Sequence, residues 1–360
     1  MKHCRYSLVA ILAIVTMILS ACGAGAAQAP AATTAPAPQE PAATAAPAAN
    51  ASSEAPLLVA INKSADQQYF VDLQTSFRET AKTLKAQART FDAKLDPSLG
   101  ISMVNDAISA GAKGIAITVP DQTIGPAIAK AAKDAGVILI ATDDSIKDAD
   151  GNPVPFVGFD GKDMGKKVGE AAAKLLTESG WLKDSTKKVG VLSVEVQTLS
   201  VCNDRTDNAK AAIKAAGVTD AQIFPVPYTG ETLAAQDAAG PIITANPTIT
   251  NWVVFACNDE GALGALNALA TAGVNPANII GVGLGAYEAC KPWAAGQSSG
   301  FKAALFISGR DVGKIAAQVL YDAISKGTPP PANTYAPTSI VNAYNFKDTM
   351  DSVSLANCSK

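Results

Sequence analysis

The chain has 360 residues, of which 48% are hydrophobic and 17% charged, and its formal net charge at pH 7 is −3. This length allows a large core and about two domains. Outside the N-terminal targeting segment there is no basic run or basic–aromatic stripe. The composition therefore argues against a nucleic-acid partner.

The first 21 residues are predicted to be an export signal. Lys2 and Arg5 precede the apolar run LVAILAIVTMIL, which is shorter than a membrane-spanning helix needs. The segment ends in Leu-Ser-Ala-Cys, which resembles a bacterial lipobox, in which Cys22 carries lipid and becomes the mature first residue. The alternative is an ordinary signal peptide that happens to contain a cysteine.

Residues 22–56 consist largely of alanine, proline and threonine. Such a segment has few apolar side chains to bury, so we expect a disordered tether. As a flexible coil it would span about 30 Å. The predicted location of the protein is the outer face of the cytoplasmic membrane, where it would be held by the lipid anchor.

The only histidine, His3, lies in the predicted export signal, so the mature chain would contain none. This argues against Ser-His-Asp and Cys-His catalysis and against a transition-metal site. We therefore expect neither a metal nor a cofactor.

From residue 57 the chain alternates short apolar runs with amphipathic segments, as in parallel sheets covered by helices. In the first half, strands are expected at 57–62, 87–91, 114–119 and 137–140. Helices are expected at 69–85 and at 123–135, and a further helix between them ends at 111. In the second half, strands are expected at 189–194, 222–226, 252–257 and 279–284, with helices at 164–179, 203–216, 232–245, 260–272 and 309–326. The predicted fold class is α/β, with two doubly wound lobes whose sites share a cleft.

Asp143 and Asp144 follow the strand at 137–140, at the end where an open α/β sheet presents ligand-binding groups. Adjacent strand residues point to opposite sides, so one acid can face the cleft while the other supports the loop. The alternative is that Asp-Asp-Ser simply begins a turn, as aspartate often does.

Six segments occur in a fixed order at near-constant offsets: INKSADQQYF, GAKGIAITVPD, VILIATDDS, RTDNAKAAIKAAG, ITNWVVFACND and ANIIGVGLGAYEA. Together they resemble the periplasmic L-arabinose-binding proteins, in the sugar-binding branch of the ABC-transporter solute-binding proteins. The resemblance covers about 57–350. LacI-type regulators share single segments, but this chain has an export signal where a DNA-binding helix-turn-helix would lie.

This resemblance implies a type I periplasmic binding protein fold, in which two α/β lobes joined by a three-segment hinge close on a sugar. The first lobe would comprise 57–162 with 307–335, and the second 163–306 with 336–360. The implied hinge crossings lie near 159–162, 306–308 and 335–338.

The resemblance also implies where a sugar would bind. The candidate ligand-binding residues are Lys63, Gln67, Tyr69, Phe70, Asp143, Asp144, Phe159, Arg205, Asn258 and Glu288. Their charged and amide groups suit sugar hydroxyls, which both donate and accept hydrogen bonds. We expect Asp144 to face the cleft, Asp143 to support the loop, and Arg205 to bind from the opposite lobe.

At several positions the chain departs from the family pattern. Gln67 replaces a glutamate, Tyr69 a tryptophan, Phe159 a methionine, Val201 a threonine and Gly285 an asparagine. Gly285 would leave room for a larger substituent, and Phe159 would offer an apolar face to sugar C–H groups. We therefore expect a pyranose hexose to bind at least as readily as L-arabinose.

Cys202, Cys257, Cys290 and Cys358 all fall in the predicted second lobe. Export favours disulfides, and four cysteines allow three connectivities. Because Cys202 and Cys257 follow strands that would be neighbours in a sheet of order 2-1-3-4, we expect a Cys202–Cys257 bond. Cys290–Cys358 would then hold the C-terminal tail.

The resulting hypothesis is a monomeric, lipid-anchored protein that captures a pentose or hexose and delivers it to an ABC permease. A second reading is a binding protein that presents a sugar or signal molecule to a membrane sensor. A third, enzymatic reading would use Asp143, Asp144 and Glu288 as acid–base groups. Neighbouring acids on one strand cannot flank a scissile bond, so no enzymatic activity is expected.

Overall fold

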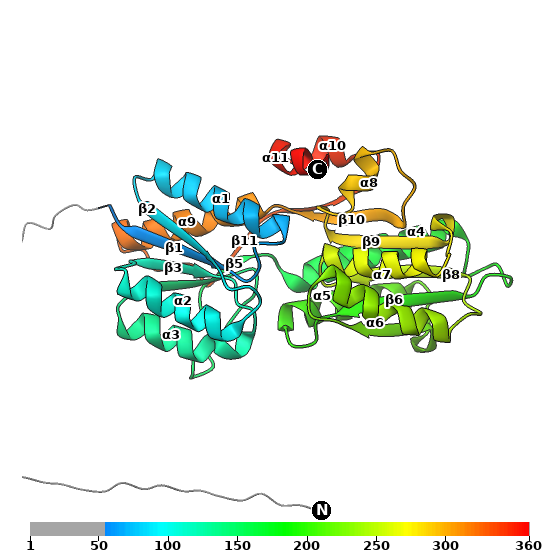
Figure 1. Ribbon diagram of the computed structural model, residues 1–360, viewed down its shortest axis with the longest axis horizontal. Helices are drawn as coiled ribbons and strands as arrows, with labels where there is room; N and C mark the ends of the chain where they lie inside the picture. Colours follow the sequence, from blue (N-terminus) through cyan, green and yellow to red (C-terminus); the bar gives the residue numbers. More distant parts are fainter. Residues whose placement is uncertain (1–54, 360) are drawn as a thin grey trace, which may run out of the picture. The chain divides into compact units, whose positions relative to one another are not determined.

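The computed structural model describes residues 55–359. The predicted export signal, Cys22 and nearly all of the tether lie outside the described residues. The described chain forms two six-stranded sheets with helices packed on them (Figure 1). Between residues 55 and 359 no helix has both the length and the apolar character needed to cross a membrane.

The first sheet is parallel throughout and has the order β11-β5-β4-β3-β1-β2. Its strands are β1 (Leu57–Asn62), β2 (Gln87–Asp92), β3 (Gly114–Ile117), β4 (Ile138–Thr142), β5 (Phe156–Gly158) and β11 (Asn333–Tyr335). Every residue of β1 is buried, which explains why LLVAIN is a continuous apolar run rather than an alternating one.

Helices cover both faces of this sheet (Figure 1). Leu58 and Ala60 of β1 belong to one apolar cluster with α1 (Gln68–Thr83) and α9 (Gly309–Lys326). The intervening residues of β1 belong to a second cluster, with α2 (Pro97–Ser109) and α3 (Gly125–Asp134). The alternation of side chains along a strand therefore divides the core into two layers.

The second sheet has the order β12-β10-β9-β8-β6-β7. Its strands are β6 (Val189–Glu195), β7 (Ile223–Pro227), β8 (Asn251–Ala256), β9 (Ile279–Gly285), β10 (Phe301–Ile307) and β12 (Thr338–Val341). All pairs are parallel except β10–β12, which is antiparallel. The run β7-β6-β8-β9 has the expected 2-1-3-4 order.

One face of the second sheet packs against α4 (Gly161–Ser179) and α5 (Ser200–Ala215). The other face packs against α6 (Thr232–Ala245) and α7 (Asp259–Thr271). The remaining short elements are η1 (Gln122–Ile124), η2 (Asp220–Gln222), η3 (Pro276–Asn278), α8 (Cys290–Ala294), α10 (Phe346–Thr349) and α11 (Ser352–Asn357).

The chain passes from one sheet to the other after β5, after β10 and after β11. These elements end at the three places where hinge crossings were expected. The sequence analysis did not identify β5, β11 and β12, which are short, or β10, whose sequence FKAALFI is a recognisable apolar run. The two doubly wound lobes are the predicted fold class, which the structure confirms.

Two disulfides lie in the second lobe, joining Cys202 to Cys257 and Cys290 to Cys358. The first links the N-terminal turn of α5 to the residue after β8, with 4.9 Å between the Cα atoms. The second links α8 to the end of α11. As a result, the elements that carry Arg205 and Asn258 are covalently joined.

Helices α4 and α5 approach each other at Gly165, and this contact positions Arg205. A Cβ atom at Gly165 would lie 2.1 Å from the backbone oxygen of Arg205. We predict that Gly165→Ala lowers the free energy of unfolding by about 1–3 kcal/mol, because the two helix backbones must separate. The midpoint of urea-induced unfolding measures this change.

Gly100→Ala is the matched control, because Gly100 also lies in a helix, α2, and a Cβ there would meet only side-chain atoms at 3.4 Å or more. It should leave the midpoint unchanged or raise the free energy of unfolding by about 0.5–1 kcal/mol. Equal midpoints for Gly165→Ala and the unsubstituted protein would contradict the close approach of α4 to α5.

Candidate functional site

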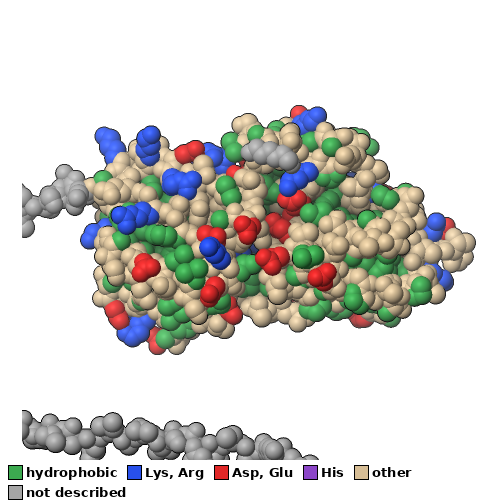
Figure 2. Space-filling model, in the orientation of Figure 1, with side chains coloured by type: hydrophobic (Ala, Val, Ile, Leu, Met, Phe, Trp, Pro, Cys, Tyr) green, Lys and Arg blue, Asp and Glu red, His purple; other side chains and the backbone are tan. Residues whose placement is uncertain are grey.

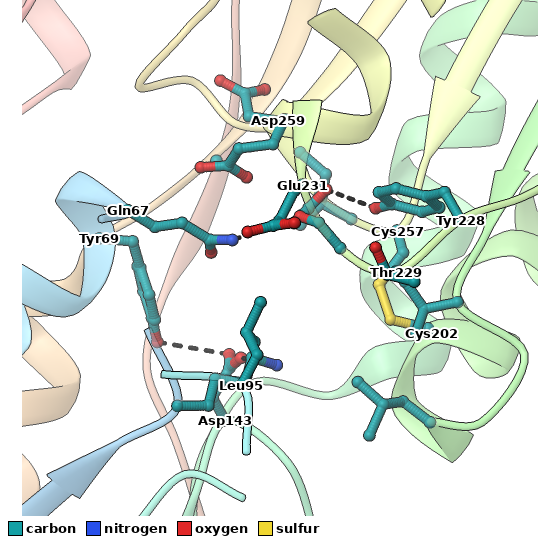
Figure 3. A pocket seen from close by; sticks show the side chains of 18 of the residues that line it. Gln67, Tyr69, Leu95, Asp143, Cys202, Tyr228, Thr229, Glu231, Cys257 and Asp259 are labelled. Carbon is teal, nitrogen blue, oxygen red and sulfur yellow. Dashed lines mark hydrogen bonds and ion pairs between the residues drawn. A yellow bond between two sulfur atoms is a disulfide. The ribbon is translucent and has the colours of Figure 1, made fainter. Parts of the chain in front are cut away.

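A cavity of about 570 Å³ lies at the carboxyl ends of strands from both sheets. This volume is within the range of about 300–1,000 Å³ that is usual for small-molecule sites. Figure 3 shows Gln67 and Tyr69 of the first lobe on one side and Tyr228 and Cys202 of the second lobe on the other. The position is the one at which open α/β sheets bind ligands.

Most of the candidate ligand-binding residues line this cavity: Lys63, Gln67, Tyr69, Phe70, Asp143, Arg205 and Asn258. Gly285, where the family has an asparagine, lines it too. Asp144, Phe159 and Glu288 do not belong to the cavity wall. The structure therefore brings together the larger part of the predicted set.

Asp143 is the acid that faces the cavity. Its carboxylate accepts hydrogen bonds from the Tyr69 hydroxyl and from Nη2 of Arg205, each at 3.4 Å. Nζ of Lys63 lies 3.9 Å from its other oxygen. Asp143 adopts a φ of +58°, a left-handed conformation that aspartate tolerates better than most residues.

The expectation that Asp144 faces the cleft is wrong. Asp144 is 0% exposed, and its Oδ2 accepts a hydrogen bond from Nζ of Lys63 at 2.5 Å. Burial raises the pKa of Asp144, and the neighbouring Lys63 ammonium opposes this shift. The alternation of an extended strand was assumed to continue through both acids, but β4 ends at Thr142 and Asp143 is left-handed.

Phe159 and Glu288 also lie elsewhere than expected. Phe159 is 2% exposed and packs near Tyr69, with 6.4 Å between the ring centroids. It therefore supports an aromatic residue of the cavity wall without offering a face to a ligand. Glu288, in the turn before α8, forms an ion pair with Lys291 at 2.8 Å.

Arg205 connects the two lobes. It lies on α5, is buried, and donates from Nη1 to the carbonyl oxygen of Cys257 at 3.1 Å. Its Nη2 donates to Asp143 of the first lobe. The buried Nε has no hydrogen-bond partner among the described residues.

Asn258 caps helix α7. Its Oδ1 accepts from the backbone N–H of Gly261 at 2.8 Å and from the Tyr228 hydroxyl at 2.5 Å. Its Nδ2 donates to the carbonyl oxygen of Gly230 at 2.9 Å. The amide thus fixes the loop after β7, and a direct contact with a sugar stays a prediction.

The structure adds acidic and aromatic wall residues that the sequence analysis did not select: Glu195, Tyr228, Glu231, Asp259, Glu260 and Tyr287. Most follow the ends of predicted strands, so the positional rule that selected Asp143 could have found them. Glu195 pairs with Lys210 at 2.9 Å. Burial raises the pKa of Asp259 to about 6 and that of Glu260 to about 8.

Further hydrogen bonds join the lobes beside the cavity. The Ser200 backbone N–H donates to Oε1 of Gln122 at 2.6 Å, and Nε2 of Gln122 donates to the Ser200 hydroxyl at 2.9 Å. Gln122 thereby caps α5, which has no capping side chain at its own N-cap residue. Gln67 donates to the carbonyl oxygen of Gly230 at 3.3 Å. Contact between the lobes and the shape of the cavity are therefore linked.

Within residues 55–359 no three His, Cys, Asp or Glu side chains are grouped so that they could hold a metal ion. The available chemistry of the cavity is hydrogen bonding, charge and apolar contact. Carboxylates accept, the Arg205 guanidinium donates, and Tyr69 and Phe70 supply apolar surface.

Two doubly wound lobes with a cavity at their strand ends define the class of type I periplasmic binding proteins. The chain belongs to the family described as the periplasmic binding protein domain, whose model matches residues 58–328. Both the fold class and the family resemblance expected from the sequence are thus confirmed.

Two relatives of this chain are L-arabinose-binding periplasmic proteins. The chain is 30% identical over 306 residues to the ABC transporter L-arabinose-binding periplasmic protein of Azospirillum brasilense, covering 82% of this chain and 90% of that protein. It is 28% identical over 256 residues to the L-arabinose-binding periplasmic protein of Escherichia coli (strain K12), covering 70% and 77%.

Solved structures share the fold. The Caulobacter myo-inositol binding protein, bound to myo-inositol, has a TM-score of 0.69 at 21% identity, covering 81% of this chain and 95% of that chain. A periplasmic solute-binding protein of an ABC transporter from Actinobacillus succinogenes 130z, with bound D-allose, has a TM-score of 0.67 at 21% identity, covering 81% and 99%.

The position of Asp144 leads to a prediction about stability. Asp144→Ala should lower the free energy of unfolding by about 2–4 kcal/mol, because it leaves the mostly buried Lys63 ammonium with only the more distant Asp143. Urea-induced unfolding, followed by circular dichroism, measures the change.

Asp134→Ala is the control, since it removes an acid of the exposed Lys130–Asp134 pair on α3. Surface pairs of this kind contribute little. If both substitutions changed the free energy of unfolding equally, the structural role of Asp144 would be refuted.

Proposed function

We propose that this protein captures a monosaccharide, a pentose or hexose, in the interlobe cavity and delivers it to the permease of an ABC importer. The observation that carries the proposal is the cavity itself, in which Asp143, after β4 of one lobe, meets Arg205, on α5 of the other. Membership of the family and the sugar-binding relatives support it.

The chemistry of the wall suits a sugar. Hydroxyl groups both donate and accept, so the Asp143 carboxylate, the Arg205 guanidinium and the Tyr69 hydroxyl can serve them. Hydrogen bonds to charged groups contribute about 1.5–3 kcal/mol each. Three of them would correspond to roughly micromolar binding before the cost of ordering is counted.

Binding would favour the closed arrangement of the lobes. Asp143 and Arg205 belong to different lobes, so a ligand that contacts both residues is bound more tightly when the lobes are together. A ligand can shift a conformational equilibrium by the difference in its affinity for the two states. Closure on the sugar would then signal the loaded state to the permease.

We further propose that the protein binds its ligand without catalysis. Asp143 is held by Arg205 and Asp144 is buried against Lys63, so the two acids cannot lie on opposite sides of a bond. The family is one of binding proteins rather than enzymes.

The organisation proposed for the chain has a first lobe of 57–162 with 307–335 and a second of 163–306 with 336–360. Residues 1–21 would direct export and residues 22–56 would tether a monomer, through lipid on Cys22, at the outer face of the cytoplasmic membrane. The periplasmic relatives support export.

The proposed function predicts that a monosaccharide binds and that Asp143 contributes to its affinity. Isothermal calorimetry with L-arabinose, D-glucose and D-galactose should detect at least one ligand. Asp143→Asn should weaken binding about 10- to 100-fold, because Asp143 is both the acceptor for the sugar and the partner of Arg205, and the substitution removes its charge.

Asp134→Asn, on the exposed surface of α3, should leave the affinity unchanged. Unchanged affinity in Asp143→Asn would reject this site, whereas the absence of any response to a broad set of monosaccharides would reject the function.

The lipid anchor predicts that Cys22→Ala releases the protein from the membrane or leaves the precursor unprocessed. Cys4→Ala is the control, since Cys4 lies in the same export signal outside the lipobox. Fractionation of cells and the mass of the purified protein measure the outcome. Normal retention and processing of Cys22→Ala would rule out the lipobox.

A further inference from the structure

The second-lobe wall of the cavity carries several carboxyl groups that form no ion pair with any described residue. The charged residues lining the cavity are Lys63, Lys94, Arg205, Asp143, Glu195, Glu231, Asp259 and Glu260. Lys63 and Arg205 are already paired with Asp143 and Asp144 of the first lobe. Lys94 is exposed.

The acids of the second lobe differ in how they are compensated. Glu195 has an ion pair with Lys210 at 2.9 Å. No lysine or arginine among the described residues lies within ion-pair distance of Glu231, Asp259 or Glu260. Figure 2 shows acidic side chains gathered over the middle of the visible face, with few basic ones among them.

Asp259 is a buried acid of this wall. It is 2% exposed, and its Oδ2 accepts from the backbone N–H groups of Glu288 at 2.6 Å and Ala289 at 3.2 Å. Its Oδ1 has no hydrogen-bond partner in the described part of the chain. The loop is thereby held in place, but half of the carboxylate remains uncompensated.

Glu260 is next to Asp259 and lines the cavity. It is half-buried and forms neither an ion pair nor a hydrogen bond with another side chain among residues 55–359. Burial first, and then the Asp259 charge, raise its pKa to about 8. At pH 7 the free side chain is therefore mostly protonated, and a cationic ligand would lower this pKa and release the proton, because it would stabilise the charged carboxylate.

We propose that the cavity selects monosaccharides that carry a free amine, and that Glu260 binds the ammonium group of such an amino sugar. The proposal rests on the proposed function, since it assigns the cavity to a sugar. An ammonium has three donors and a positive charge, so it compensates Glu260 in a way that a neutral hydroxyl cannot. Asp143 and Arg205 remain available for the sugar hydroxyls.

Two features support a cation in this position. Glu231, which Figure 3 shows at the cavity, adds a further acid at an exposed part of the wall and would attract cationic ligands. Tyr228 also lines this side, and an aromatic face is a favourable neighbour for an ammonium group.

The test compares matched ligands by calorimetry with the purified protein, below the pKa of the sugar amine. The pairs are D-glucosamine with D-glucose and D-galactosamine with D-galactose, and the N-acetyl derivatives serve as uncharged controls. We expect at least one amino sugar to bind about tenfold or more tightly than its parent sugar, and acetylation to remove this gain.

Glu260→Gln should bring the ratio of the two affinities close to one while leaving the parent sugar bound. Glu178→Gln, on the exposed surface of α4, should leave the ratio as it is in the unsubstituted protein. The comparison of ligands does not depend on either variant folding normally.

The outcomes separate this inference from the proposed function. If neutral sugars bind and amines bring no gain, or if Glu260→Gln keeps the full preference, the inference is overturned and the proposed function stands. If neither neutral nor amino sugars bind, the proposed function fails and the inference fails with it.

Discussion

The arrangement of the site depends on the buried ion pair between Asp143 of the first lobe and Arg205 of the second. Their side chains are 6% and 5% exposed, and Nη2 and Oδ1 lie 3.4 Å apart. The backbone fixes the position of each partner. Asp143 lies in the left-handed turn after β4. Arg205 lies on α5, which is in close contact with Gly165 and is joined to the end of β8 by the Cys202–Cys257 bond. The relative position of the lobes therefore sets the geometry of the cavity.

This pair is part of a buried group in which two cations meet two anions. Lys63 and Arg205 face Asp143 and Asp144, so the first-lobe side of the cavity is close to electrically neutral. Taking charges out of water is costly, and such a group is retained where its geometry is useful. In the proposed function, its use is to orient Asp143 and Arg205 toward a sugar. The second-lobe wall lacks this balance, which is why Glu260 is the residue that can distinguish a charged ligand from a neutral one.

Much of the fold could be predicted from local patterns. The buried strands β1, β6, β8 and β9 are largely apolar runs, and the order β7-β6-β8-β9 in the second sheet followed from the doubly wound pattern. The elements that were not identified are mainly short strands at or near the sheet edges, where three or four residues carry little periodic signal. Most of the cavity wall could be located by the rule that ligand-binding residues follow the carboxyl ends of parallel strands. These strand ends lie together at one edge of each sheet.

The sequence by itself determined the α/β class, the family, the strand-end origin of the site and the residue types available there, because these depend on hydrophobic periodicity and on ordered motifs. Only the tertiary structure decided which of two adjacent acids faces the cavity. A positive φ at Asp143 reverses the expected alternation, and no pattern of neighbouring residues specifies it. The tertiary structure likewise decided which charges are compensated. Lys63 and Arg205 pair with acids that are not their nearest acids in the sequence, so only the folded positions show which acids they reach. Glu260 is not among these acids, and in the described part of the chain it forms no ion pair.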